Sequence, residues 1–302
     1  MKPAWPSPYL LLVLTTLFWS GNFVLARAVH LSVPPVGLSF WRWSLAGAIL
    51  LPFVWRSMAA QWPLVRRHLT LVTLLALLGV SSFNTLVYLG LQTTTATNGV
   101  LLQSIIPLVI ILLSRLILGV LVSAAQAFGI LVSLLGVLAI ITRGDLQVLL
   151  QFAFTRGDLL VLAAVVAWGF YSTLLKKLPR ALHGLPLLGY TIAIGVLGIA
   201  PVYAWEIARG LRMTPDALTL ASVAYVAVFP SLLAYLFWNR AVAQLGPNRC
   251  GQFIHLMPVF GSLLSVLFLG ERLHGYHLAG ILFVAAGIAI ATRRAGAGNG
   301  KP

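Results

Sequence analysis

Ten apolar stretches dominate this sequence, and each is long enough to cross a lipid bilayer. A membrane-spanning helix needs about 20 mostly apolar residues to cross about 30 Å of hydrocarbon. The stretches end at Pro, Gly or charged residues, except for a short polar break from Gln92 to Asn98. The predicted spans are 9–29, 36–55, 69–90, 97–118, 122–142, 158–176, 186–205, 218–238, 249–269 and 276–292. The sequence therefore predicts an all-α polytopic membrane protein.

The composition excludes a water-soluble domain. Of the 302 residues, 60% are hydrophobic and 8% are charged, whereas about a quarter of a soluble protein is charged. The net charge of +15 does not indicate nucleic-acid binding, because the Lys and Arg residues are scattered between apolar runs and form no continuous stripe. The single cysteine, Cys250, excludes an intramolecular disulfide. We therefore expect the lipid bilayer, and no nucleic acid, as a partner.

The distribution of basic residues predicts the topology. With ten spans, 13 of the 20 Lys and Arg residues fall on the side of the two chain ends, 6 fall on the other side, and Arg42 lies within a span. Cytoplasmic connections of membrane proteins carry an excess of Lys and Arg. We therefore expect both termini in the cytoplasm, a first span that is retained, because no cleavage site follows it, and a disordered tail at 296–302.

An internal repeat relates the two parts of the chain. A shift of 151 aligns PLVIILLSRLILG from Pro107 with PVFGSLLSVLFLG from Pro258, and seven of these thirteen positions are identical. A shift of 149 aligns LFWSGNF around Trp19 with VAWGFYS around Trp168. The halves are predicted at 1–145 and 146–302.

The number of spans in each half determines its orientation. Because five is an odd number, the second half crosses the membrane in the opposite direction to the first. The predicted fold is therefore ten transmembrane helices in two inverted five-helix repeats. Inverted repeats are typical of transporters that alternate access around a site near the bilayer midplane.

Several short motifs, in their order and spacing, resemble the drug/metabolite transporter superfamily, EamA type. They are WSGNF in the first span, FWR at Phe40–Arg42 in the second, and LGERL at Leu269–Leu273 after the ninth. The resemblance covers essentially the whole chain and is strongest with the aromatic amino acid exporters of bacterial inner membranes. It implies outward movement of amino acids and related small metabolites through a central cavity, without a cofactor. One departure is that Leu118–Val120 has Val where many members have Glu, which leaves Glu271 without a counterpart.

The candidate residues of the central cavity are mostly aromatic or carry an amide. Aromatic rings suit an apolar side chain, and amides suit the carboxylate and amine of an amino acid. Each aromatic residue, taken alone, is also typical of an interfacial belt or of helix packing. The predicted substrate-binding residues are Trp19, Asn22, Arg42, Asn84, Tyr88, Asn98, Gln103, Trp168, Tyr171, Tyr235, Trp238 and His255.

Two of these candidates have two interpretations each. Arg42 either extends its flexible stem to the membrane surface or faces a wet cavity and binds a substrate carboxylate. His255 is either a substrate hydrogen-bonding group or a titrating switch, or it is a neutral histidine whose hydrogen bonds a neighbouring helix satisfies. The five acidic residues lie at predicted helix ends or in loops, so a carboxylate relay inside the membrane is unsupported.

Prolines and glycines suggest mechanical roles. Pro107 and Pro258 occupy equivalent positions in the two halves and are candidate hinges of a gate, although static kinks that aid packing fit equally well. Four glycines at seven-residue spacing predict close contact between helices. They are Gly129, Gly136, Gly280 and Gly287.

Other function classes fit the sequence less well. An intramembrane enzyme needs a nucleophile with a base, or a metal cluster, and the sequence contains no HExxH, no GxSxG and no paired acids. A multidrug or lipophilic-cation exporter of the same fold is the alternative, but no carboxylate in the middle of a span favours it. A passive channel is a third possibility. The substrate, the coupling ion and the oligomeric state stay open.

Overall fold

A computed structural model of the chain describes residues 6–29, 33–145, 147–150, 154–269 and 272–292. Glu271 and the tail at 296–302 lie outside these ranges. Within them all regular secondary structure is helical, and ten helical segments are long and apolar enough to cross a membrane. The predicted all-α, multi-pass fold is thereby confirmed.

The first five spans are built from straight and interrupted helices. The elements are α1 (Pro8–Val29), α2 (Pro35–Arg67), α3 (Leu69–Leu75), the π-helix η1 (Ala76–Ser82), α4 (Phe83–Gly90), α5 (Ala96–Gln103), α6 (Ile106–Leu118) and α7 (Ala124–Ile141). The short helix α8 (Gln147–Leu150) follows in the connection to the sixth span.

The last five spans repeat this pattern. The elements are α9 (Arg156–Leu174), η2 (Leu175–Lys177), η3 (Arg180–Leu182), α10 (Leu185–Ala208), α11 (Ala217–Val226), the π-helix η4 (Ala227–Leu233), α12 (Ala234–Leu245), α13 (Pro247–Gly251), η5 (Gln252–His255), α14 (Leu256–Leu269) and α15 (Gly275–Thr292).

Two helices extend beyond the predicted spans. The second span was expected to end at residue 55, but α2 continues to Arg67, with Pro52 and Pro63 inside it. The eighth was expected to end at residue 238, but α12 continues to Leu245, where Gly246 stops it with a positive φ of 82°. Hydropathy reports how much of a helix lies in lipid, whereas a helix ends only where its backbone hydrogen bonds end.

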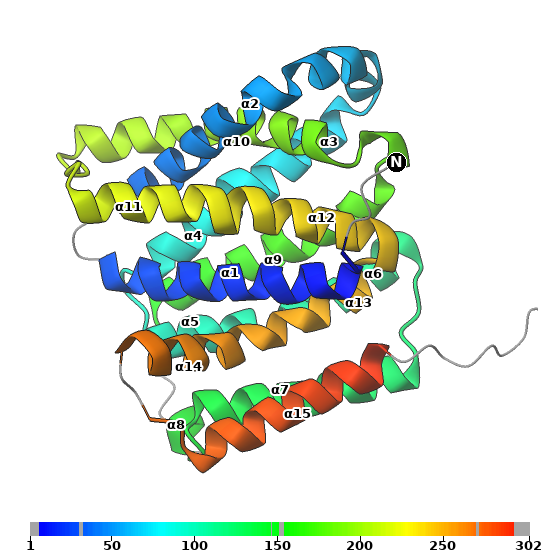
Figure 1. Ribbon diagram of the computed structural model, residues 1–302, viewed down its shortest axis with the longest axis vertical. Helices are drawn as coiled ribbons and strands as arrows, with labels where there is room; N and C mark the ends of the chain where they lie inside the picture. The colour runs from blue at the N-terminus through cyan, green and yellow to red at the C-terminus, as the bar shows by residue number, and fades with distance from the viewer. Residues whose placement is uncertain (1–5, 30–32, 146, 151–153, 270–271, 293–302) are drawn as a thin grey trace, which may run out of the picture.

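The two halves run through the bundle in opposite directions. Helix α1 begins, and α15 ends, at one end of the bundle, which we call the Pro8 face; α15 begins at the opposite end, the Gly275 face (Figure 1). Helix α1 opens the first half from the Pro8 face, whereas α9 opens the second from the Gly275 face. The repeats are therefore inverted.

Each half also contains a π-helix at the equivalent place. Helix η4 lies 151 positions after η1, at both its first and its last residue. A π-turn shifts the backbone hydrogen-bond register and frees carbonyl groups, and such turns are frequent at functional sites. Proline favours the shift in η4, because Pro230 has no backbone N–H to donate.

Helices α7 and α15 cross in close contact through their glycines. A Cβ atom on Gly129 would lie 2.5 Å from the carbonyl oxygen of Gly287, and one on Gly136 would lie 2.6 Å from that of Gly280. The repeat relates Gly129 to Gly280 and Gly136 to Gly287, so it maps this contact onto itself. The two helices therefore cross on the pseudo-twofold axis that relates the halves.

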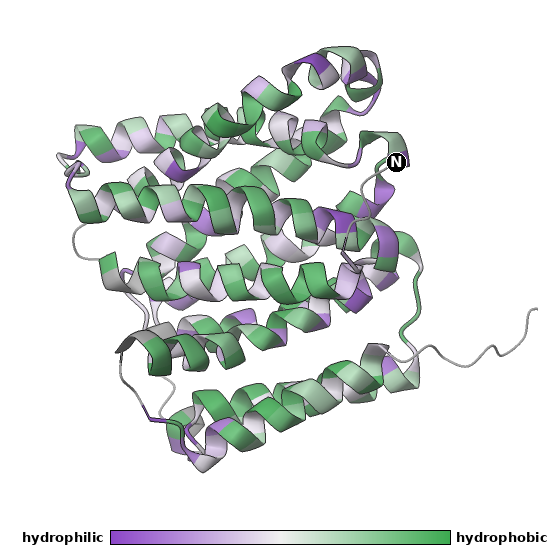
Figure 2. Cartoon of the chain, viewed as in Figure 1, coloured by the Kyte–Doolittle hydropathy of each residue, from purple (hydrophilic) through white to green (hydrophobic). Residues whose placement is uncertain are grey.

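The outside of the bundle is apolar, as lipid requires. Phe53 is 79% exposed, Leu197 73% and Leu282 69%. Hydrophilic residues gather mainly toward the ends of the helices, while apolar residues cover their middle (Figure 2). Many polar side chains within the spans, Arg42 among them, are turned inward and buried.

Candidate functional site

Arg42 on α2 is fully buried at the centre of the bundle, so it does not extend to the membrane surface. Its Nε atom donates to Oγ of Ser231 at 2.8 Å. Its Nη1 atom donates to Oδ1 of Asn84 at 3.0 Å and of Asn22 at 3.3 Å, and to the hydroxyl of Tyr88. Three helical elements, α1, α4 and η4, thus hold the guanidinium of Arg42 in place.

The guanidinium nevertheless keeps one free edge. Its Nη2 atom is buried without a hydrogen-bond partner among the described residues. The described carboxylates bind elsewhere: Asp145 to Gln147, Asp158 to Thr94 and Thr155, Glu206 to the N–H groups of Val36 and Gly37, and Asp216 to Thr219. A buried charge without a counter-ion is costly, and guanidinium groups bind carboxylates through paired N–H donors. The site is therefore suited to an anionic group at Nη2.

Ser231 is a site residue that the sequence analysis missed. It follows Pro230 in η4, and its hydroxyl donates to the carbonyl of Val226 at 2.6 Å while it accepts from Arg42. The proline in the middle of the eighth span was visible in the sequence, but the π-turn that directs the next side chain inward was not. Proline within a span is thus the signal that could have located this serine.

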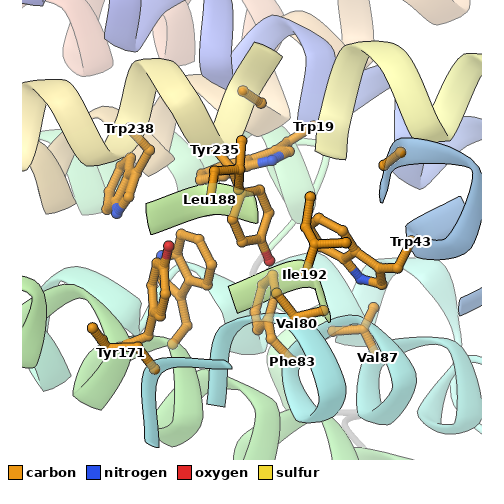
Figure 3. Packing of buried hydrophobic residues seen from close by; sticks show 14 of the residues in the cluster. Trp19, Trp43, Val80, Phe83, Val87, Tyr171, Leu188, Ile192, Tyr235 and Trp238 are labelled. Atoms are coloured by element: carbon orange, nitrogen blue, oxygen red, sulfur yellow. The ribbon is translucent and has the colours of Figure 1, made fainter. Parts of the chain in front are cut away.

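Aromatic rings from both halves pack around this polar centre. Trp19 meets Trp168 edge to face, with ring centroids 5.0 Å apart, and Trp238 at 5.3 Å. Trp168 also stacks on Tyr171 at 4.9 Å and meets Tyr235 at 5.3 Å. Figure 3 shows Trp19 of α1, Tyr171 of α9, and Tyr235 and Trp238 of α12 converging on one place. Five of the predicted site residues therefore form one aromatic cluster.

The hydrogen bonds at the centre follow the repeat. The hydroxyl of Tyr88 donates to Oδ1 of Asn22 at 2.6 Å, and the hydroxyl of Tyr171 donates to Oδ1 of Asn239 at 2.8 Å. Under the two shifts Asn22 corresponds to Tyr171 and Tyr88 to Asn239. Each half thus contributes the same tyrosine–asparagine bond, with the two partners exchanged. Arg42 donates to Asn22 and Tyr88 of the first pair, so its charge lies on that pair's side of the pseudo-twofold axis.

The two equivalent tryptophans are bonded differently. Nε1 of Trp19 donates to the carbonyl oxygen of Pro230 in η4 at 3.2 Å. The equivalent bond would join Nε1 of Trp168 to the carbonyl oxygen of Gly79 in η1, but that oxygen accepts from the hydroxyl of Tyr235 instead. Nε1 of Trp168 is buried without a partner among the described residues. Trp19 and Trp168 therefore differ in their hydrogen bonds, although the repeat makes them equivalent in sequence.

The structure places the remaining predicted site residues around the edge of this centre. His255 is engaged at both ring nitrogens, by the carbonyl of Ser104 at 3.0 Å and by Oγ of Ser133 at 2.6 Å, which agrees with its structural interpretation. Asn98 lies at the Gly275 face, where its side chain contacts Asp158. Gln103 lines a small central cavity.

That central cavity measures about 20 Å³. This volume holds about one water molecule and no amino acid. In this conformation the aromatic rings fill most of the space in which the sequence predicts a substrate cavity. The centre of the bundle is therefore closed.

A much larger cavity, of about 850 Å³, lies between α1, α5 and α14 on one side and α7 and α15 on the other; we call it the open vestibule. Phe23 and Met257 line both this vestibule and the central cavity, so they separate the two. The vestibule lies toward the Gly275 face, where Arg143 and Arg272 make its wall basic. This large cavity therefore lies on the Gly275 side of the closed centre.

Pro107 and Pro258 lie beside breaks in their spans. Pro107 occupies the first turn of α6, just after the gap that separates α5 from α6, and Pro258 follows the 3₁₀ segment η5 in the ninth span. Discontinuous spans of this kind expose backbone carbonyls at membrane depth, where substrates bind in many transporters. Both prolines therefore begin helical segments, and their role as hinges stays a prediction.

The candidate site contains no sign of a metal centre. No group of three or more His, Cys, Asp or Glu side chains that could hold a metal ion occurs in the part of the chain that the structure describes.

Inverted halves, discontinuous spans and a buried polar centre define a multi-pass membrane protein of the transporter class. The sequence model of the EamA-like transporter family matches residues 6–142 and again residues 155–293. The chain belongs to this family, as the resemblance of its motifs predicted.

Relatives of similar length accompany this match. The uncharacterized transporter YyaM of Bacillus subtilis is 26% identical over 94% of this chain and 93% of its own. A probable terminal-alkyne amino-acid exporter of Streptantibioticus cattleyicolor is 27% identical over 94% and 92%. An S-adenosylmethionine/S-adenosylhomocysteine transporter of Chlamydia muridarum is 23% identical over 88% and 85%. One solved crystal structure has the same fold, with a TM-score of 0.74 at 20% identity over 94% and 96% of the two chains.

Proposed function

We propose that this protein exports amino acids, aromatic or other apolar ones, and related small metabolites across a bacterial inner membrane. The substrate binds beside Arg42 at the centre of the bundle, when the aromatic rings that close it move apart, and leaves through the open vestibule. Access alternates between the two faces. The observation that carries this proposal is the free Nη2 edge of Arg42 among aromatic rings. The guanidinium binds the carboxylate, and the rings pack against the apolar side chain.

Two relatives support the same substrate class. The Streptantibioticus protein is named for an amino acid and the Chlamydia protein for two amino acid derivatives. These substrates share an α-amino acid group, which is the part that Arg42 and the amides of Asn22 and Asn84 suit. The variable part of such substrates would then lie against Trp19 and Trp168.

Export of lipophilic cations is the alternative function of this fold. The charges in the described structure oppose it, because Arg42 is buried at the centre and the open vestibule is lined by Arg143 and Arg272. A cation would meet like charge along the whole path.

The proposal is tested with liposomes that contain the purified protein and are loaded with a mixture of amino acids. We expect the apolar and aromatic amino acids to be released faster than from protein-free liposomes, in a saturable manner that external amino acid stimulates. The measurement is made with and without a proton gradient, which identifies the coupling mode. Release of cationic dyes without release of amino acids would instead support the alternative.

Arg42 is tested in the same assay. The variant Arg42→Gln loses a charged hydrogen bond worth about 1.5–3 kcal/mol, which corresponds to an about 10- to 150-fold loss of transport. Arg42→Lys keeps the charge but not the planar donor geometry, so it should retain part of the activity. Both variants must elute from detergent size-exclusion chromatography as the parent protein does. Parental transport by a well-folded Arg42→Gln variant would contradict the assigned role.

A further inference from the structure

Buried polar groups without partners gather in the half of the bundle near the Pro8 face. Ser114 on α6, Ser172 and Thr173 on α9, and Asn248 in α13 are buried, and none of their side-chain polar atoms has a hydrogen-bond partner among the described residues. Lipid offers no hydrogen bonds, so buried polar groups in a membrane protein normally find partners within it. Several unsatisfied groups in one place indicate a second conformation in which they are satisfied.

The internal repeat points to the same residues independently. Each of these four residues is the counterpart, in the other half, of a residue that lines the open vestibule. The pairs are Phe23 and Ser172, Val24 and Thr173, Thr97 and Asn248, and Ser265 and Ser114. The first two pairs follow the shift of 149, and the last two follow the shift of 151. These four unsatisfied residues are thus also the ones that the repeat relates to the wall of the open vestibule.

Close packing of α6 fills this region in the present conformation. A Cβ atom on Gly169 of α9 would lie 2.6 Å from Cγ1 of Val109, and one on Gly251 of α13 would lie 3.0 Å from Cδ1 of Ile110. Ser20, the counterpart of Gly169, lines the open vestibule. Residues that line the open vestibule near the Gly275 face therefore have counterparts that are packed together near the Pro8 face.

We propose that Ser114, Ser172, Thr173 and Asn248 line a second vestibule, closed in this structure, that opens to the Pro8 face in the alternate conformation. The proposal rests on the proposed function as a carrier, and it assigns the path by which substrate reaches Arg42. Three hydroxyls and one amide suit a small zwitterionic or anionic solute, because they solvate charge and add no negative charge of their own. When this packing opens, water and substrate satisfy these groups.

The test measures the reactivity of engineered thiols. The native thiol, Cys250, is buried and is first removed by Cys250→Ser. Ser114→Cys and Ser172→Cys are then introduced singly into proteoliposomes and treated with a membrane-impermeant maleimide from the Pro8 face. The matched control is Ser39→Cys, since Ser39 is equally buried but satisfied by Thr85 at 2.7 Å.

We expect both vestibule variants to react at least about tenfold faster than the control, because the alternate conformation is populated during exchange. Ser265→Cys, in the open vestibule, should react from the Gly275 face and shows that the reagent works on the folded protein. If the vestibule variants react only after denaturation, as the control does, the proposal is overturned.

The same preparations separate this proposal from the proposed function. Amino acid release by Ser172→Cys without labelling from the Pro8 face would overturn the second vestibule and leave the exported substrate standing. Labelling without release of any amino acid would support the vestibule and overturn the substrate class.

Discussion

At the scale of single residues, the two halves carry equivalent groups in unequal roles. Trp19 is bonded to the carbonyl of Pro230, while its counterpart Trp168 is not bonded, because Tyr235 occupies the carbonyl of Gly79. If the alternate conformation exchanges the roles of the halves, Trp168 takes the carbonyl of Gly79 and Trp19 releases that of Pro230. The indole N–H groups would then stabilise opposite conformations.

Substitution of the two tryptophans tests this exchange. Trp19→Phe removes a bond made in the present conformation, so the thiol of Ser265→Cys in the open vestibule should react more slowly than in the parent. Trp168→Phe removes a bond made in the other conformation, so the same thiol should react faster. The measurement is the maleimide reaction rate from the Gly275 face. A shift in the same direction for both variants would contradict the exchange.

Much of the centre could be predicted from residue types and spacing. The four-residue spacing of Asn84 and Tyr88 placed them on one helix face, and both contact Arg42. The interpretation of Arg42 could not be settled from sequence, because burial depends on which helices surround it. Asn98 shows the limit, since it stands at the start of the predicted span 97–118, and the structure places it near the Gly275 face, where its side chain contacts Asp158.

At the scale of helices, the contact of α7 with α15 depends on glycines from both partners. The seven-residue spacing of these glycines predicted it, because small residues at regular intervals allow backbones to approach. The carbonyl of Gly287 lies where a side chain on Gly129 would begin. The two helices therefore have little room to adjust to any larger residue.

A single methyl group tests the tightness of this contact. Gly129→Ala should lower the midpoint of thermal unfolding in detergent by about 2–10 °C, since overpacking costs about 1–3 kcal/mol in a protein of this size. Gly261→Ala on α14 is the control, because a Cβ atom there meets nothing within 4 Å. An unchanged midpoint in Gly129→Ala would show that α7 and α15 separate readily.

Hydropathy located the spans, but not their interruptions. The π-helices η1 and η4 and the breaks before Pro107 and after Gly251 do not follow from the apolar pattern. They depend on backbone groups that bind partners from other helices, such as Ser104 with His255. Local sequence shows where a helix is permitted, and tertiary contacts decide where it is broken.

At the scale of the whole molecule, helices of the two halves interlock. Trp19 on α1 bonds to η4, Tyr235 on α12 bonds to η1, and Ser81 in η1 bonds to the carbonyl of Gly195 on α10 at 2.8 Å. The division of the chain at residue 145 and the cytoplasmic position of the termini stay predictions. The interlocking implies that neither half completes the site alone.

Expression of the halves as two chains tests the division. Residues 1–145 and 146–302, produced together, should associate in the membrane, because bonds across the interface position Arg42 and the aromatic cluster. The measurement is copurification through a tag on one half. Gly136→Leu in the first half should weaken the association of the halves, since the added side chain collides with the backbone of Gly280. Failure of the unmodified halves to copurify would contradict the predicted boundary.

The crossing of α7 and α15 also bears on how such a chain could arise. Because the pseudo-twofold axis maps this contact onto itself, one five-helix polypeptide contains the residues of both sides. Two copies inserted in opposite orientations could therefore dimerise through it. Duplication and fusion of its gene would then preserve the pairing at a fixed one-to-one ratio. Fusion also frees each copy to diverge: Ala193 stands where the repeat places the counterpart of Arg42, so the centre holds one arginine where a symmetric dimer would carry two or none.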